Sequence, residues 1–281
     1  MREAIAAHAA FDRPVVHDVY VTREAADRYA DEIAVARTAA IAVTVVTDEV
    51  LSAMTGTVSP QGLLAVCATV DRPLADVLAG LAPTLVAVLA HVRDPGNAGT
   101  VLRAADAAGA DAVLLTEASV DVHNPKCVRS TAGSIFHLPV VQGVDLAATV
   151  TALRSAGLVV LAADGDGDRD LDDLLDEVDR VDRVDRLHQA DREHQADREH
   201  QGDPPGIEPP LLSRPTAWLF GNEAWGLADA YRALADAVVR VPIHGRAESL
   251  NLATAATVCL YASARAQRPS AAPDISSHRR Q

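Results

Sequence analysis

Short, continuously apolar runs alternate with segments of helical pattern over the second two thirds of this chain. Five of these runs are predicted to be strands: Leu85–Ala90, Ala112–Leu115, Leu158–Ala162, Ala217–Phe220 and Ala237–Val241. The helices predicted between and after them are Ala98–Ala108, Asn124–Ser130, Leu146–Ser155, Ala228–Ala235 and Leu250–Ala266. Apolar strands that alternate with helices favour a mainly parallel sheet that is covered on both faces. The fold class that we predict is therefore α/β, with its main domain over residues 85–266.

The first 70 residues predict a second, smaller α/β unit. Its expected elements are a helix at Ala4–Ala10, a strand at Val15–Val21, a helix at Arg23–Ala36, a strand at Ala42–Val46, a short helix opening at Thr47–Glu49 and a strand at Leu63–Cys67. Residues 71–84 are then a linker that contains one short helix. The chain is long enough for two such domains.

One segment of the main domain, residues 168–212, interrupts the alternation of strand and helix. It contains a slipped repeat, since His188–Glu193 recurs as His194–Glu199. With few apolar residues and many charges, the segment has little surface to bury. We expect a disordered or partly helical insertion at the surface here, and a disordered tail at residues 267–281.

The net charge of −14 looks unfavourable for a protein that binds nucleic acid, but it is concentrated in this segment. Residues 164–203 contain 16 acidic residues and 6 arginines, a net charge of −10. The acidity therefore belongs mostly to the insertion, and the rest of the chain is close to neutral.

Other features exclude several classes of protein. The three cysteines are scattered and fit neither a zinc site nor a disulfide framework, which favours a reducing cytoplasm. No apolar stretch is long enough to span a membrane, and the N-terminus lacks a signal peptide's apolar run. The Asp164-Gly-Asp-Gly-Asp168 stretch resembles a calcium loop but has Arg169 and Leu175 at the positions where Gly and Glu are needed. We expect no metal and no membrane.

The first motif with chemical potential follows the strand that ends near His91. Asn97 is predicted to cap the helix that Gly109 ends, and Arg103 lies off that helix's buried stripe. A capped helix with a surface arginine would explain this motif by itself.

Two further motifs follow the strands Ala217–Phe220 and Ala237–Val241. Gly221-Asn222-Glu223 with Gly226 places a carboxylate between two glycines, which permit tight turns. In the third motif Ser249 is a plausible cap and Asn251 lies in the first helical turn. The carboxyl ends of parallel strands are where ligands bind in open α/β sheets, so the motifs favour one site. A strand-to-helix turn with a capping Glu would explain the second motif equally well, and tight packing within one subunit would explain the small-residue helix of the third.

Several common nucleotide-binding signatures are missing. The sequence contains no P-loop, no Rossmann glycine pattern and no nucleophilic triad. Aromatic residues make up only 3% of the chain, so we do not expect a platform that stacks the bases of single-stranded nucleic acid.

Taken together, the three motifs resemble the SpoU-type (TrmH-like) branch of the knotted (SPOUT) RNA methyltransferases over residues 85–266. Residues 1–70 are more weakly similar to the small L30e-like substrate-binding domain of that family. Family members begin this domain with a basic stretch and a strand, so the resemblance implies a domain shortened at its N-terminus. It also implies a deep trefoil knot in the methyltransferase domain and a homodimer.

The resemblance also implies a function and its residues. The protein would use S-adenosyl-L-methionine to methylate a ribose 2′-hydroxyl. The resemblance favours 23S ribosomal RNA as the target, with tRNA as the second candidate. The alternative class is a non-catalytic RNA-binding or ribosome-assembly factor. The resemblance implies these catalytic residues: Arg103, Asn97, Glu223, Ser249 and Asn251. The residues that it implies around the cofactor are Gly221, Asn222, Val241, Ile243, Leu250 and Leu252. Arg103 would either activate the hydroxyl or hold a neighbouring phosphate.

Overall fold

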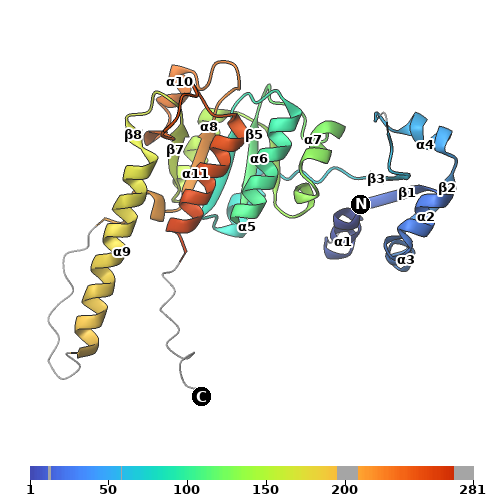
Figure 1. Cartoon of the computed structure of the whole chain (residues 1–281), viewed down its shortest axis with the longest axis horizontal. Helices are drawn as coiled ribbons and strands as arrows, with labels where there is room; N and C mark the ends of the chain where they lie inside the picture. The colour runs from blue at the N-terminus through green and yellow to red at the C-terminus, as the bar shows by residue number, and fades with distance from the viewer. Residues whose placement is uncertain (12–13, 58, 195–207, 269–281) are drawn as a thin grey trace.

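A computed structural model describes residues 1–11, 14–57, 59–194 and 208–268 as two α/β domains (Figure 1). The larger domain contains a seven-stranded parallel sheet in the order β6-β5-β4-β9-β7-β10-β8. Its strands are β4 (Leu85–Leu89), β5 (Ala112–Thr116), β6 (Val140–Val144), β7 (Val159–Ala163), β8 (Arg169–Asp170), β9 (Thr216–Phe220) and β10 (Ala237–Arg240). All five residues of β4, β5 and β9 are buried, as expected for strands covered on both faces.

Helices cover both faces of this sheet, because alternate residues of each strand point to opposite sides. One face packs against α6 (Pro95–Ala108), α7 (Pro125–Ser130), α9 (Leu171–His194) and α11 (Leu252–Ala266). The other packs against α5 (Leu74–Leu81), α8 (Leu146–Ser155) and α10 (Asp229–Arg232). The predicted mainly parallel α/β sheet is confirmed.

The N-terminal domain is built on a three-stranded sheet in the order β2-β1-β3, in which β1 is parallel to β2 and antiparallel to β3. Its elements are α1 (Arg2–Ala10), β1 (Val16–Thr22), α2 (Arg23–Arg28), α3 (Ala30–Thr38), β2 (Ala42–Val46), α4 (Asp48–Met54) and β3 (Leu63–Cys67). The helix predicted over Arg23–Ala36 is therefore two helices. They meet at Tyr29, whose backbone leaves the helical region.

Both ends of residues 168–212, where we expected a disordered or partly helical insertion at the surface, are packed into the main core. Residues 169–170 form an edge strand, and the helix that follows buries Leu171, Leu174 and Val178 in the main core. Leu212, in the short 3₁₀ helix at Leu211–Ser213, is buried in the same core. Apolar residues at intervals of three and four form one helical stripe, which the count of charges concealed. Residues 195–207 and the predicted disordered tail from 269 onward lie outside the described residues.

The sequence also failed to predict strand β6. Its residues Gln142 and Gly143 interrupt the apolar run, and as an edge strand it pairs only with β5 among the described residues. None of the described helices is both long and apolar enough to cross a bilayer.

Candidate active site at the carboxyl edge of the sheet

Glu223 connects the first two motifs of the sequence at the carboxyl edge of the sheet. It lies in the loop after β9, and its carboxylate accepts hydrogen bonds from Asn97 Nδ2 at 3.3 Å and from the backbone N–H of Asp94 at 3.1 Å. The backbone N–H of Arg93 adds a longer bond of 3.4 Å. Strands β4 and β9 are neighbours, so the turn before α6 and the loop after β9 leave the sheet side by side.

Asn251 brings the third motif into the same network. Its Nδ2 donates to Asn97 Oδ1 at 3.1 Å, while its Oδ1 accepts from the backbone N–H groups of Ala253 and Thr254. A continuous chain of hydrogen bonds thus runs from the first turn of α11 through Asn97 to Glu223. The three motifs, up to 154 residues apart in sequence, converge on one patch.

The helix caps differ from the two that the sequence predicted. Asp94, not Asn97, caps α6, since Asp94 Oδ1 accepts from the Asn97 N–H at 2.8 Å and Pro95 takes the first helical position. Asn251, not Ser249, caps α11. Because Asp94 does the capping, the amide of Asn97 is left to bind Glu223 and Asn251.

Asp94 is itself held in place by charge. Lys126 Nζ lies 3.0 Å from Asp94 Oδ2, and the backbone N–H of Asn97 together with this lysine lowers the pKa of the Asp94 carboxyl below its ordinary value. The carboxylate therefore remains ionised at neutral pH, and the helix that carries Asn97 starts at a defined residue.

The loop after β9 is closed so tightly that it requires glycine at both ends. A Cβ on Gly221 would lie 2.4 Å from the backbone carbonyl of Gly226, and Gly226 has a φ of 65°. Asn222 closes the loop through two backbone hydrogen bonds with Gly226 and donates from Nδ2 to the His91 carbonyl at 2.7 Å. Asn222, implied as a cofactor residue, is only 6% exposed, and its side chain shapes the loop.

The remaining residues implied for the cofactor lie near the loops that follow the adjacent strands β9, β7 and β10. Strand β7 lies between β9 and β10, so the loops after these strands leave the sheet together. Val241 follows β10 and Leu252 begins α11, both half-buried, whereas Ile243 and Leu250 keep 39% and 37% of their surface exposed. This edge thus offers apolar side chains to a ligand.

Arg103 and Ser249 are not part of the network within one chain. Both are exposed, and neither has a hydrogen-bond or ion-pair partner among the described residues. Arg103 lies six residues after Asn97 in α6, which places it about 9 Å further along the helix and about 120° around it. Its side chain therefore leaves the solvent side of α6, away from Asn97.

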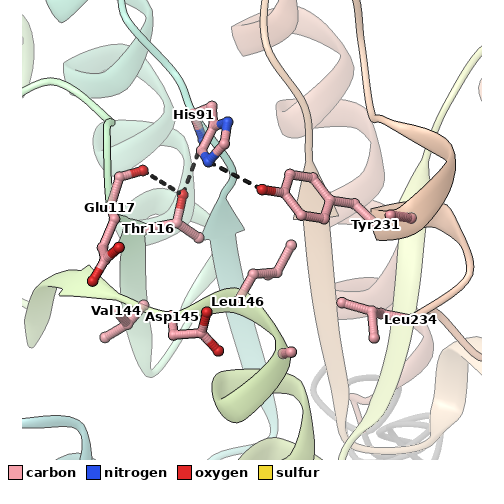
Figure 2. A pocket seen from close by; sticks show the side chains of 10 residues that line it. His91, Thr116, Glu117, Val144, Asp145, Leu146, Tyr231 and Leu234 are labelled. Carbon is pink, nitrogen blue, oxygen red and sulfur yellow. Dashed lines mark hydrogen bonds between the residues drawn. The ribbon is translucent and has the colours of Figure 1, made fainter.

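Sequence reasoning missed a second group of residues, on the other side of the Glu223 loop. His91 lies two residues after the end of β4 and has a φ of 55°. It donates its N–H to Thr116 Oγ1 at 3.0 Å, and its Nε2 lies 3.2 Å from Tyr231 Oη. Figure 2 shows His91 and Tyr231 facing each other at a cavity of about 280 Å³. The His91–Tyr231 pair therefore connects β4 to α10 directly behind Asn222.

Asp164 was also missed, although it belongs to the stretch that was considered for calcium. Its Oδ1 lies 3.3 Å from Arg232 Nη1, and its Oδ2 accepts from the Leu227 N–H at 3.5 Å, so it links the loops after β7 and β9. An acidic residue directly after an apolar strand was the available signal. The described residues contain no group of three or more metal-ligating side chains.

The cysteines provide no nucleophile among the described residues. Burial raises the pKa of the Cys127 thiol to about 11 and also raises the pKa of Cys259. Neither thiol is ionised at neutral pH, so neither can act as a nucleophile.

Comparisons with known proteins agree with this arrangement. The family model described as SpoU rRNA Methylase matches residues 84–261, and one described as RNA 2'-O ribose methyltransferase substrate binding matches residues 2–73. The 23S rRNA (guanosine(2553)-2'-O)-methyltransferase RlmP of Bacillus subtilis is 32% identical over 214 residues, which are 76% of this chain and 69% of the relative.

Proteins from Streptomyces viridochromogenes are also similar. Its 23S rRNA (uridine(2479)-2'-O)-methyltransferase is 34% identical over 176 residues, 61% of this chain, and the match spans about half (49%) of that relative. The crystal structure of its SpoU methyltransferase AviRb in complex with AdoMet has a TM-score of 0.69 and 26% identity, and covers 94% of this chain and 88% of that one. The resemblance stated from the three motifs is confirmed.

Proposed function

Because the chain belongs to the SpoU rRNA methylase family, we propose that it methylates a ribose 2′-hydroxyl of 23S ribosomal RNA with S-adenosylmethionine as the methyl donor. The observation that carries this proposal is the hydrogen-bonded chain from Asn251 through Asn97 to Glu223. It unites all three motifs at the edge of the sheet where α/β domains bind ligands. Action on ribosomal RNA places the protein in the cytoplasm.

The apolar rim of the patch fits the cofactor. Ile243 and Leu250 are exposed at the edge beside the Gly221 loop, and an adenine ring would cover such side chains. Gly221 allows the loop after β9 to close without a side chain in the way. When bound, S-adenosylmethionine supplies the methyl group as an electrophile.

The polar centre of the patch would orient the ribose. The Glu223 carboxylate accepts hydrogen bonds, and the Asn97 and Asn251 amides can each donate and accept. A ribose hydroxyl is a weak nucleophile, so holding it in line with the methyl group is a large part of the catalysis. We assign this positioning to the Asn251–Asn97–Glu223 chain.

Arg103 would hold a phosphate next to that ribose rather than remove a proton. A guanidinium keeps its proton in proteins, which makes it a poor base, whereas its planar fork matches phosphate oxygens. Because Arg103 points away from Asn97 within one chain, a second copy would complete the site. Helices α6 and α11 lie side by side in Figure 1, and α11 exposes Val258 and Tyr261. We infer a homodimer through this surface, in a domain whose C-terminal helix passes through a trefoil knot.

Arg103→Ala is expected to reduce methyl transfer to in vitro transcribed 23S RNA by at least about 100-fold, since misplacing the reacting groups has that effect. Arg183→Ala, a matched change at an exposed arginine of α9, is expected to keep full activity. Thermal unfolding of both variants should match that of the parent protein. Near-normal activity of Arg103→Ala would reject the assignment.

Mixing two inactive variants tests whether the site is shared between subunits. In a heterodimer of Arg103→Ala and Glu223→Gln, a shared site leaves one of the two sites intact, so activity should return. If each site used the arginine of its own subunit, the mixture would stay inactive.

Mapping 2′-O-methyl groups in RNA from cells with and without the protein would identify the methylated nucleotide. A methyl group lost from tRNA would overturn the choice of ribosomal RNA.

A further inference from the structure

We propose that Trp225 and Arg93 form a stacking platform for an unpaired base of the substrate RNA, next to the methylated ribose. The inference rests on the proposed function. Trp225 lies two residues after Glu223, and 56% of its surface is exposed, whereas Trp218 is fully buried. The guanidinium carbon of Arg93 lies 5.3 Å from the centre of the Trp225 ring. An aromatic ring with a stacked arginine is thus presented to solvent beside the active site.

The arginine of this platform has a free charge. No carboxylate lies within ion-pair distance of the Arg93 guanidinium among the described residues, while the nearby Asp94 carboxylate is paired with Lys126. An arginine that lacks an acidic partner can hold a phosphate while its flat face rests on a ring. The indole face and this cation together have the composition of a surface that binds single-stranded nucleic acid.

The platform is rigidly joined to the active site. The backbone N–H of Arg93 donates to the Glu223 carboxylate at 3.4 Å. Trp225 lies inside the loop that the Asn222–Gly226 backbone pair closes, and Asn222 Oδ1 accepts from the Ala224 N–H at 2.8 Å. Because both side chains extend from backbone that is already held, stacking a base would require little ordering of the protein.

The chemistry of the substrate explains why a base belongs there. A ribose that enters a protein site must come from a nucleotide whose base is unstacked or splayed outward, and proteins cover such bases with aromatic or arginine planes. The indole ring lies two residues after the carboxylate that would face the ribose, so the base it would meet is one close to the methylated nucleotide. The low aromatic content of the chain led us to expect no such platform, but composition does not report where a single tryptophan lies.

Fluorescence titration with oligoadenylate tests the proposal without relying on catalysis. The two tryptophans differ in exposure, so oligoadenylate should quench the emission of Trp225 and not that of Trp218. In Trp225→Phe the quenching should vanish, while oligoadenylate affinity measured by anisotropy of a labelled probe should fall less than threefold, since phenylalanine also stacks. Trp225→Ala should weaken binding by on the order of tenfold, and Arg93→Ala by a similar or smaller factor. Leu187→Ala, which removes an exposed leucine of α9, should leave affinity unchanged.

Three outcomes would overturn the inference. The first is an unchanged oligoadenylate affinity in Trp225→Ala. The second is a loss of S-adenosylmethionine affinity in Trp225→Ala, measured by calorimetry, that equals its loss of oligoadenylate affinity; the ring would then cover the cofactor. The third is a change of Trp225→Ala from dimer to monomer in sedimentation, which would mean that the ring belongs to the subunit interface. If instead the parent protein fails to methylate 23S RNA but Trp225-dependent binding persists, the proposed function fails and the platform stands.

Discussion

The two sheets of this protein are covered to different degrees. Every residue of the central strands β4 and β9 is buried between two layers of helices, whereas none of the five residues of β2 is buried. The small domain keeps the face that Asp18 shares with Val66 open, and Val66 is 42% exposed. A sheet covered on both faces forms the edge at which we propose the active site, while the half-covered sheet leaves surface open to solvent. The difference in burial predicts that a core mutation lowers the free energy of unfolding more in the larger domain than in the N-terminal one.

The largest effect is expected from shortening a buried side chain of α9, the helix whose charged composition concealed its contact with the main core. Leu174→Ala, at a residue 1% exposed in α9, should lower the free energy of unfolding by about 2–5 kcal/mol, because it removes buried methyl groups and leaves a cavity. Leu187→Ala in the same helix, at a residue 61% exposed, should change it by less than about 0.5 kcal/mol. Urea unfolding followed by tryptophan emission measures both. Equal effects would place the start of α9 outside the core.

A smaller and more local effect is expected in the N-terminal domain. Ile33→Val removes one methyl group from the core of that domain, where Ile33 is 4% exposed, and should destabilise it by about 0.5–1.5 kcal/mol. Amide hydrogen exchange should speed up in β1 and α3 and stay constant in β4 and β9. Loss of protection in both sheets together would show that the domains unfold as one unit.

The smallest effect concerns a histidine between the domains. His137 lies 2.7 Å from Asp106 of α6 and 3.0 Å from Glu3 of α1, and these two carboxylates raise its pKa above the ordinary value of 6.5. Its protonated form is favoured in the folded state, so this contribution is complete below pH 6.5 and is lost as pH rises through the raised pKa. The parent protein should therefore lose thermal stability as the pH rises above 6.5 and through the raised pKa of His137.

His137→Gln provides the control, since glutamine does not titrate. Its melting temperature should change less over the same pH range, and protease cleavage near residues 71–73 should depend less on pH. Parallel pH profiles of the two proteins would show that the contact between α1 and α6 does not depend on the charge of His137.

Predictions from the sequence were accurate where local chemistry decides the structure. Strands β4, β5, β7, β9 and β10 lie where apolar runs predicted them, because a continuous run suits a strand buried on both faces. The sequence did not reveal that α9 packs into the core, because its charged sequence conceals a stripe of three buried residues. It also did not predict β6, where Gln142 and Gly143 interrupt the run. In both cases burial depends on neighbours that the local pattern does not contain.

The sequence by itself therefore determined the α/β class, the family and the three motifs of the site, since these depend on residue type, order and spacing. Only the tertiary structure decided that Asp94 and Asn251 are the caps and that Asn97 joins Glu223 to Asn251. The physical reason is that hydrogen bonds depend on distances and directions between elements far apart in the chain. Those distances are set by the neighbouring strands β4 and β9, which no short stretch of sequence specifies.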